Sequence, residues 1–207
     1  MSPYDSQPFS DVLDRIAAPT ASPGGGSAAA LAGALGAAVG QMCAGLPRTR
    51  HGTPEERARL DEAVRDFAAH RARLVALAAD DEKAVAALMK AARRPHGTAA
   101  ADEARAEALA DATRVATRVP LATLRVCAAA LERLRDVAAM GARVAASDVG
   151  VAIGLLKTSA DGAASNVRAN LHGLDDEAFV RETTRQLSRL LDGVARAAHA
   201  ALAALQD

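Results

Sequence analysis

Aromatic side chains are the first thing that this 207-residue chain lacks, since it has no Trp, one Tyr and three Phe. Alanine dominates its apolar half, and Ala is the strongest helix former, whereas aromatic and β-branched residues favour strands. No stretch shows the period-two alternation of a half-buried strand. The sequence therefore predicts an all-α protein, a single domain over residues 1–207 built as a bundle of about six to seven closely packed helices.

The chain also has no excess of either charge, because 25 Lys and Arg balance 25 Asp and Glu. Neutralisation of phosphates needs clustered Lys and Arg, and no basic patch on the scale of a domain is visible, so the sequence argues against nucleic acid as the main partner. Only Cys43 and Cys127 are present, too far apart in sequence for a metal-binding pair or a disulfide framework. The apolar run Ala28–Val39 is too short and too Gly-rich to span a membrane, and the N-terminus lacks secretory features. We expect a cytoplasmic protein without a metal or a membrane partner.

A glycine run is the most informative feature that is present. Gly24, Gly25 and Gly26 precede Ser27 and a series of small residues that predicts a helix over about 26–46. A plain turn needs one glycine or two, so the third predicts either a positive φ or a close approach to the backbone. Free N–H groups at a helix start bind an anion or a polarised oxygen. The run is thus a candidate ligand-binding loop, and the alternative is a tight turn under a neighbouring helix.

Asp81 is the candidate catalytic residue. It lies in a helix predicted over about 55–93 and opened by Thr53 and Pro54. Its neighbours at one and two helical turns are all apolar, and they are Leu74, Leu77, Val85 and Leu88. Burial of a carboxylate raises its pKa and makes proton transfer near neutral pH feasible. The alternative interpretation is an ion pair between Asp81 and an arginine of an adjacent helix.

Asn166 and Asn170 form a second candidate site, one turn apart on a predicted helix. Asn is a mediocre helix former, so two on one face indicate a hydrogen-bonding task, either with a ligand or between helices. Asp148 opens the same predicted helix. Taken alone, it is more typical of an N-cap than of a binding residue.

Other residues recur at helical spacing. One apolar set predicts a short amphipathic helix that ends before Pro19, and it consists of Phe9, Val12, Leu13 and Ile16. One small set predicts close approach of another backbone, and it consists of Ala29, Gly33, Gly36 and Gly40. Since the chain has few bulky residues to cover such a face, we expect two copies to bury it across a two-fold axis.

Taken together, these motifs resemble the cyclodeaminase/cyclohydrolase family of folate one-carbon enzymes. The resemblance covers nearly the whole chain. It is carried by APTASPGGGSAAA at 18–30, the acidic pair at 80–81, VPL at 119–121, SDVGVA at 147–152 and NVRANL at 166–171. The glycine and SDVGVA blocks in this order are its most specific part.

The resemblance implies an all-helical homodimer that acts on tetrahydrofolate without a metal or an organic cofactor. The reaction would be that of a formimidoyltetrahydrofolate cyclodeaminase or of a methenyltetrahydrofolate cyclohydrolase, with Asp81 as the catalytic aspartate. The substrate-binding candidates are Gly24, Gly25, Gly26, Ser27, Asp148, Asn166 and Asn170.

Two segments depart from the family pattern. LPRTRH at 46–51 replaces a Gly-Lys-Lys-type segment, and RPH at 94–96 replaces Leu-Pro-Lys. A folate-binding homologue without catalysis therefore stays an alternative, as does a helical dimerisation module.

Overall fold

Six α-helices make up this computed structural model, which describes residues 2–4 and 6–206. They are α1 (Phe9–Ala17), α2 (Gly25–Gly45), α3 (Pro54–Ala92), α4 (Ala99–Met140), α5 (Ala146–Leu171) and α6 (Glu177–Ala204), with a 3-10 turn at Arg143–Ala145. The described residues contain no strand and a single isolated bridge, between Thr49 and Gly141. The expected all-α fold is therefore confirmed.

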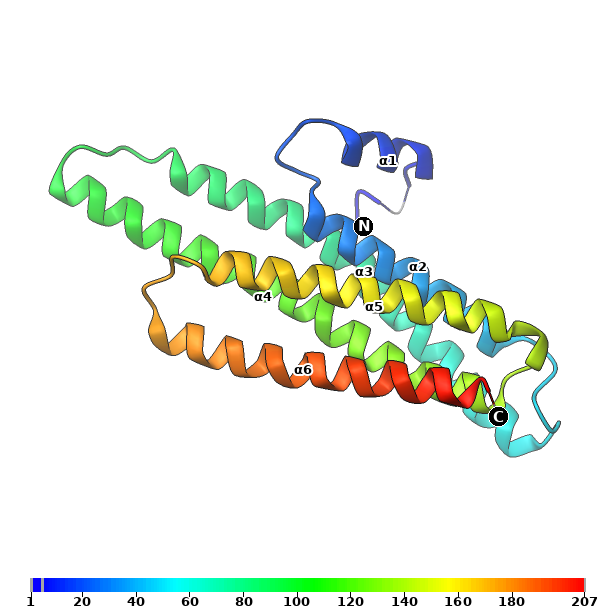
Figure 1. Cartoon of the computed structure of the whole chain (residues 1–207). Helices are drawn as coiled ribbons and strands as arrows, with labels where there is room; N and C mark the ends of the chain where they lie inside the picture. The colour runs from blue at the N-terminus through cyan, green and yellow to red at the C-terminus, as the bar shows by residue number, and fades with distance from the viewer. Residues whose placement is uncertain (1, 5, 207) are drawn as a thin grey trace.

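The helices α2, α3, α4 and α5 pack around a common core, and α6 lies along α4 and α5 (Figure 1). Large apolar side chains of α3, α4 and α5 fill this core, and the fully buried ones include Leu60, Phe67, Leu74, Leu77, Leu124, Leu131, Leu134, Leu156 and Val167. Helix α2 contributes mainly Ala and Gly. Because its side chains are short, α2 lies close to its neighbours.

The start of α3 is fixed by its own side chains. Thr53 Oγ1 accepts the Glu56 N–H at 3.2 Å, and the Glu56 carboxylate accepts the Thr53 N–H, which completes a capping box with Pro54 at the first helical position. Glu56 also accepts hydrogen bonds from Thr49 and His51. The Thr49 hydroxyl contributes most to a Glu56 pKa lowered to about 2. The predicted start of the long helix is correct to one residue.

The small-residue face of α2 is covered by the same chain. A Cβ on Gly33 would lie 2.6 Å from Ser159 Oγ, one on Gly36 would lie 3.0 Å from Leu156 Cγ, and one on Gly40 would lie 2.8 Å from Phe67 Cε1. Each distance is shorter than an ordinary van der Waals contact. The expectation that these glycines meet a second subunit is therefore wrong, because α3 and α5 already occupy the space.

Helix α2 is also the one helix in the described part of the chain that is long and apolar enough to cross a membrane. It has 21 residues, and its most apolar window has a mean hydropathy of 1.4. The helix is thus longer than the apolar run Ala28–Val39, which the sequence analysis judged too short to span a membrane. Of that window, 44% is buried inside the bundle. The buried residues contact α3 and α5, so core packing explains the apolar character of this helix on their side.

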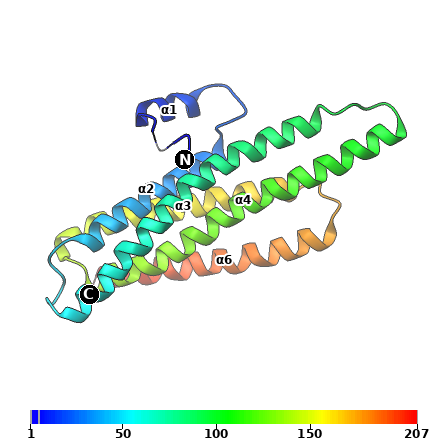
Figure 2. The same cartoon turned by 180° about the vertical axis from the view of Figure 1, so that it is seen from behind.

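Two parts of the chain extend away from the bundle (Figure 2). The hairpin of α3 and α4 projects beyond the ends of the other helices. Helix α1 lies beside the start of α2. It is amphipathic as predicted and buries Val12, yet Phe9 is 68% exposed and Leu13 is 50% exposed. Tertiary packing therefore covers only part of the apolar stripe of α1.

Candidate active site

Asp81 and the glycine run meet at the first turn of α2. A Cβ built on Gly26 would lie 2.2 Å from Asp81 Oδ1 and 2.6 Å from its Cγ, so only glycine leaves room for this carboxyl group. The same test on Gly25 finds no atom within 4 Å, and on Gly24 it finds an ordinary contact of 3.5 Å with the Ala21 carbonyl. The close approach that the third glycine predicted is therefore an approach by Asp81. None of the three has a positive φ, so that part of the expectation is wrong.

Ser27 binds the Asp81 carboxyl group. Its buried hydroxyl lies 2.9 Å from Asp81 Oδ2 and 3.1 Å from the Ala78 carbonyl oxygen. When Asp81 is ionised, Ser27 donates to the carboxylate. When Asp81 is protonated, Ser27 accepts its proton in a hydrogen bond and donates to Ala78 instead. The contact therefore satisfies both protonation states of Asp81, as proton transfer requires.

The pKa of Asp81 is raised above its usual value. Burial is the main cause, and the negative charge of Glu82 adds to it, whereas hydrogen bonds from the Ser27 hydroxyl and backbone N–H act in the opposite direction. Among the described residues, Asp81 makes no ion pair with an arginine. The alternative of an interhelical ion pair is thus excluded within the described part of the chain, and a half-buried carboxyl of raised pKa is what the sequence predicted.

Sequence reasoning missed three residues beside Asp81. The Tyr4 hydroxyl donates a short hydrogen bond to Glu82 Oε1, and Arg15 pairs with Glu82 Oε2 at 2.7 Å. The Arg15 guanidinium carbon also lies 5.3 Å from the centre of the Tyr4 ring. These contacts attach the N-terminal segment to α3 one residue after Asp81. Tyr4 is the one tyrosine of the chain, and that singularity was the available signal.

The antiparallel packing of α5 on α2 places Asn166 near this site. Leu156 lies against Gly36, Ser159 against Gly33, and Gly162 within 3.1 Å of Ala29 for an added Cβ. The same register puts Asn166, one turn further along α5, level with the first turn of α2. Its amide nitrogen donates to the carbonyl of Gly162 at 2.9 Å, within its own helix, which leaves the amide oxygen as an acceptor.

Asn170 has a structural task. Pro120 lacks an N–H, so the Ala116 carbonyl of α4 has no partner in its own helix. Asn170 Nδ2 donates to that carbonyl oxygen at 2.9 Å. Helix α4 is continuous through Pro120. The polar contact between helices that the sequence left open is the observed role of the Asn170 amide nitrogen.

Asp148 lies at the other end of α2. It belongs to the first turn of α5, whose N-cap is Ala145, so the N-cap interpretation is wrong. Its charge helps to raise the pKa of the Cys43 thiol, after the larger effect of burial. Ser27 and Cys43 are separated by about 24 Å of helix, at about 1.5 Å per residue. The structure does not bring Asp148 to Asp81 within one chain.

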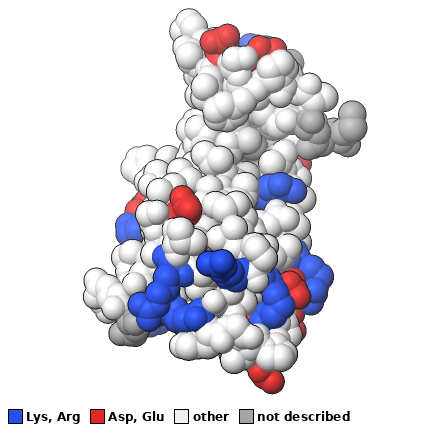
Figure 3. Space-filling view, turned by 90° about the vertical axis from the view of Figure 1, so that its right-hand side faces the viewer, with Lys and Arg blue, Asp and Glu red and all other residues white. Residues whose placement is uncertain are grey.

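The basic loop after α2 lies at that far end as well. Arg50 donates to the Ala138 carbonyl oxygen at 2.8 Å, and Arg57 donates to the carbonyls of Leu46 and Ala44, each at 2.8 Å. Figure 3 looks onto this end of the bundle and shows Lys and Arg gathered over its lower half. The contacts that Arg50 and Arg57 make are structural, since they bind backbone carbonyls.

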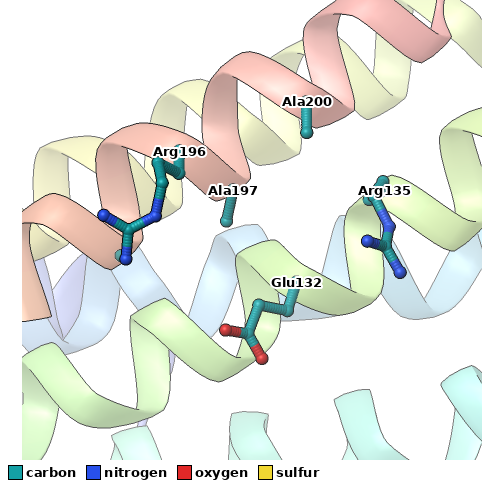
Figure 4. A pocket seen from close by; sticks show the side chains of 6 residues that line it. Glu132, Arg135, Arg196, Ala197 and Ala200 are labelled. Carbon is teal, nitrogen blue, oxygen red and sulfur yellow. The ribbon is translucent and has the colours of Figure 1, made fainter.

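The pockets on the other side of the bundle do not include Asp81. One hollow of about 300 Å³ lies between α4 and α6, where Glu132 and Arg135 extend from α4 and Arg196 from α6 (Figure 4). A second lies among α3, α4 and α6 and includes Asp80. No sequence-predicted site residue lines either hollow. Among the described residues, no group of His, Cys, Asp and Glu has the arrangement of a metal site.

The arrangement at Asp81 defines a class of protein: a helical bundle in which a half-buried carboxyl group touches the start of a glycine-led helix. Comparisons with known proteins identify the family. The sequence model of formiminotransferase-cyclodeaminase matches residues 8–189, so the chain belongs to this family.

Several known proteins are similar to the chain over most of its length. The methenyltetrahydrofolate cyclohydrolase of Methylorubrum extorquens is 37% identical over 179 residues, which are 86% of each chain. The formimidoyltransferase-cyclodeaminase of Sus scrofa is 31% identical over 89% of this chain, and that of Mus musculus is 32% identical over 90%. This chain spans only 34% of the pig protein and 36% of the mouse protein.

A solved structure shares the fold. The crystal structure of formiminotetrahydrofolate cyclodeaminase from Thermotoga maritima superposes with a TM-score of 0.88 and covers 97% of this chain and 96% of its own. The two sequences are 23% identical, so this likeness concerns the fold.

Proposed function

We propose that this protein is a folate one-carbon enzyme that acts on the bridge between N5 and N10 of tetrahydrofolate. The observation that carries the proposal is the position of the Asp81 carboxyl group at the start of α2. Ser27 binds it there, and Gly26 leaves room for it. Methenyltetrahydrofolate cyclohydrolase is the first reaction to test, because the cyclohydrolase relative matches 86% of both chains, whereas the mammalian relatives extend far beyond this one.

In this reaction water attacks the methenyl carbon. Asp81 in its ionised form takes a proton from that water, and the carbon becomes tetrahedral. Protonation of N5 then lets the bond between N5 and this carbon break. The hydroxyl group on the carbon loses its proton as the carbonyl forms, and the formyl group stays on N10. General base catalysis of this kind contributes about 10²–10⁴ in rate.

A cyclodeaminase reaction is the second candidate, supported by the similarity to the mammalian formimidoyltransferase-cyclodeaminases. Here N10 attacks the formimino carbon on N5, and ammonia leaves after its nitrogen is protonated. Asp81 in its protonated form would supply that proton. The same carboxyl group serves both reactions because its contacts with Ser27 satisfy both protonation states.

The proposed substrate site includes the start of α2. The backbone N–H groups of Gly24, Gly25 and Gly26 are suited to a carboxylate or a pterin oxygen, and the Asn166 amide oxygen to a donor on the pterin edge. Gly25 supports this placement because a Cβ there would have open space, so the chain itself leaves its surroundings free. We propose that the tetrahydrofolate derivative is bound without a metal or an organic cofactor.

We further propose a cytoplasmic homodimer formed through the outer face of α2. This helix carries no charged residue between Gly25 and Gly45, and it leaves Leu35 50% exposed and Met42 46% exposed. Val151 of the adjacent α5 is 54% exposed. A second copy that packs antiparallel on this face would bring the far end of its α2, with Asp148, toward the first turn of the facing α2.

An absorbance assay of methenyltetrahydrofolate tests the function. The protein is supplied first with the methenyl compound and then with the formimino compound, and the wild type is compared with Asp81→Asn. Turnover of one substrate that falls by about 10²-fold or more in the variant supports the proposal and selects the reaction.

Absence of turnover with both substrates contradicts an enzyme. A thermal-shift titration with folinic acid then separates a binding protein from a dimerisation module, since a ligand at 100 times its Kd adds about 2.7 kcal/mol of stability.

A further inference from the structure

The hollow among α3, α4 and α6 combines apolar walls with arginine side chains. Its volume is about 470 Å³. Leu77 and Leu121 form a buried part of its wall, Phe179 is half-buried, and Val115 is 48% exposed. Sites that bind small molecules between helices have volumes of about 300–1,000 Å³ and mostly apolar linings with a few polar groups. The size and lining of this hollow therefore fit a small organic ligand.

Two arginines of α4 border the hollow without a carboxylate partner. The guanidinium carbon of Arg118 lies 5.6 Å from the centre of the Phe179 ring, and Arg118 makes no ion pair with a described residue. Arg125 donates to the side-chain oxygen of Gln186, which is neutral. Arg118 and Arg125 lie on one face of α4, two helical turns or about 10 Å apart. The hollow therefore carries positive charge that the chain does not neutralise by a direct contact.

The two acidic residues of the hollow are already paired with other cations. The Asp80 carboxylate accepts a hydrogen bond from Lys83 at 3.0 Å and lies 3.5 Å from Arg73, the third arginine of the hollow. Glu182 pairs with Arg185 of its own helix, which lies outside the hollow. An anion that enters the hollow would therefore meet the two arginines of α4 without competition from these carboxylates.

Thr183 adds a hydroxyl group that the fold does not use. The residue lines the hollow and is only 4% exposed, and its hydroxyl makes no hydrogen bond with a described residue. Three threonines of α4 behave differently, since each donates to the carbonyl one turn earlier, and they are Thr113, Thr117 and Thr123. The Thr183 hydroxyl is thus free to bond a ligand held in the hollow.

The position of Thr183 on α6 places it between the two arginines. Phe179 and Gln186 lie one turn to either side of Thr183 on the same face of α6. Phe179 contacts Arg118, and Gln186 contacts Arg125. The three polar groups therefore follow one another along the hollow, with the hydroxyl in the middle.

We propose that this hollow binds a small organic anion, a carboxylate or a phosphate monoester with an apolar body. The acid group would bond the guanidinium groups of Arg118 and Arg125 and the Thr183 hydroxyl, since guanidinium matches the geometry of both acid groups. The apolar body would contact Val115 and Phe179.

This site is separate from the candidate active site. Asp80 borders the hollow, whereas Asp81 contacts Gly26, and successive residues of a helix point about 100° apart. The inference therefore goes beyond the proposed function and does not depend on it.

Isothermal titration calorimetry of the wild-type protein tests the site. Phenyl phosphate and benzoate combine an acid group with an apolar ring, whereas inorganic phosphate has the acid group alone. We expect one molecule of phenyl phosphate or of benzoate to bind per chain. Inorganic phosphate should bind at least about tenfold more weakly than phenyl phosphate, because it buries no apolar surface.

Variants of the lining residues locate the binding. Arg118→Gln and Arg125→Gln each remove one charge and should weaken binding of the aromatic anion by about tenfold or more. Thr183→Val keeps the shape of the side chain and removes the hydroxyl. It should weaken binding by about threefold or more and leave the melting temperature at or above that of the wild type. Arg181→Gln is the matched control, because Arg181 is an arginine of α6 that pairs with Glu177 and does not line the hollow.

The results separate a binding site from a general basic surface. Losses in the three lining variants with unchanged affinity in Arg181→Gln support the proposal. Binding of only one of the two aromatic anions also supports it and identifies the acid group. Failure of both to bind the wild type overturns it, as does equal affinity for inorganic phosphate and phenyl phosphate or an equal loss in the control. Displacement of the bound aromatic anion by folinic acid, one for one, overturns a separate site and assigns the hollow to the folate. A wild type without turnover contradicts the proposed function alone.

Discussion

The pKa of the Asp81 carboxyl group is subject to two opposing effects. Burial disfavours the charged form, whereas the Ser27 hydroxyl and backbone N–H at the start of α2 favour it, and burial prevails. A raised pKa means that folding favours the protonated form. Asp81 therefore costs no stability below its usual unfolded pKa, and the cost grows as the pH rises through the raised folded value.

Asp81→Asn should consequently leave the protein as stable as the wild type at pH 7, or more stable, while turnover falls. The amide keeps an acceptor for Ser27 and removes the buried charge. Thermal unfolding at several pH values checks this, and the difference between the two proteins should shrink toward acid pH. A variant that melts well below the wild type at pH 7 would show that the carboxylate is a structural partner.

Turnover in the hydration direction should follow the ionisation of Asp81. The rate should rise with pH, with a midpoint above the ordinary aspartate value of 3.8. The pH profile of kcat/KM measures this midpoint. A midpoint at or below the ordinary value would exclude Asp81 as the base.

The second and third glycines of the run, Gly25 and Gly26, make a matched pair of sites for substitution. Gly26→Ala puts a methyl group 2.2 Å from Asp81 Oδ1, so the carboxyl must move, and activity should fall by about tenfold or more. Gly25→Ala meets no atom within 4 Å and should leave the position of Asp81 unchanged. Kinetic constants and urea unfolding of both variants check the prediction, and equal kcat losses would contradict it.

At the scale of elements, Asn170 joins α5 to α4 at the one carbonyl that Pro120 leaves without a partner in its helix. The contact holds the C-terminal end of α5 against α4. A buried carbonyl without a partner costs about 1–3 kcal/mol. The bond is therefore a structural constraint on the distance between the two helices.

A double-mutant cycle isolates this bond. Asn170→Ala should destabilise the protein by about 1–3 kcal/mol, because the Ala116 carbonyl loses its donor. In a Pro120→Ala background the restored N–H supplies that donor, so the same substitution should cost less. Urea unfolding of the four proteins gives the coupling. Equal costs in both backgrounds would show that Asn170 acts in another way.

At the scale of the whole molecule, the small-residue face of α2 belongs to the core and the opposite face is exposed. Gly36→Leu should thus destabilise the monomer, since overpacking costs about 1–3 kcal/mol and Leu156 occupies the space. The proposed homodimer would instead use the outer face of α2, which carries no charged residue. The homodimer is therefore proposed through the exposed residues of α2 and no longer through its glycines.

Leu35→Glu should convert a dimer into a monomer, because it places a charge at the middle of the proposed contact. Leu13→Glu is the matched control, since Leu13 of α1 is equally exposed at 50% and lies outside that face. Light scattering at micromolar concentration measures the mass of each. A wild-type mass near 21.1 kDa, or dissociation by the control alone, would refute the proposed interface.

Local sequence patterns by themselves determined the helices and the candidate site residues. Ala-rich composition, the Thr53 capping box and the apolar repeats act within a few residues, so the all-α fold could be predicted from the sequence. Asp81 stood out because a carboxylate interrupts an apolar stripe. The family motifs pointed to the same residue.

Only the tertiary structure decided which partners these residues have. The position of the N-terminal segment on α3 brought Tyr4 and Arg15 to Glu82, the residue after Asp81. The antiparallel packing of α5 on α2 separated Asp148 from Asp81. The glycines of α2 likewise proved to face the core, because α3 and α5 supply the bulky side chains that cover them. Contacts between distant segments depend on how whole helices pack, and no pattern within one helix encodes that packing.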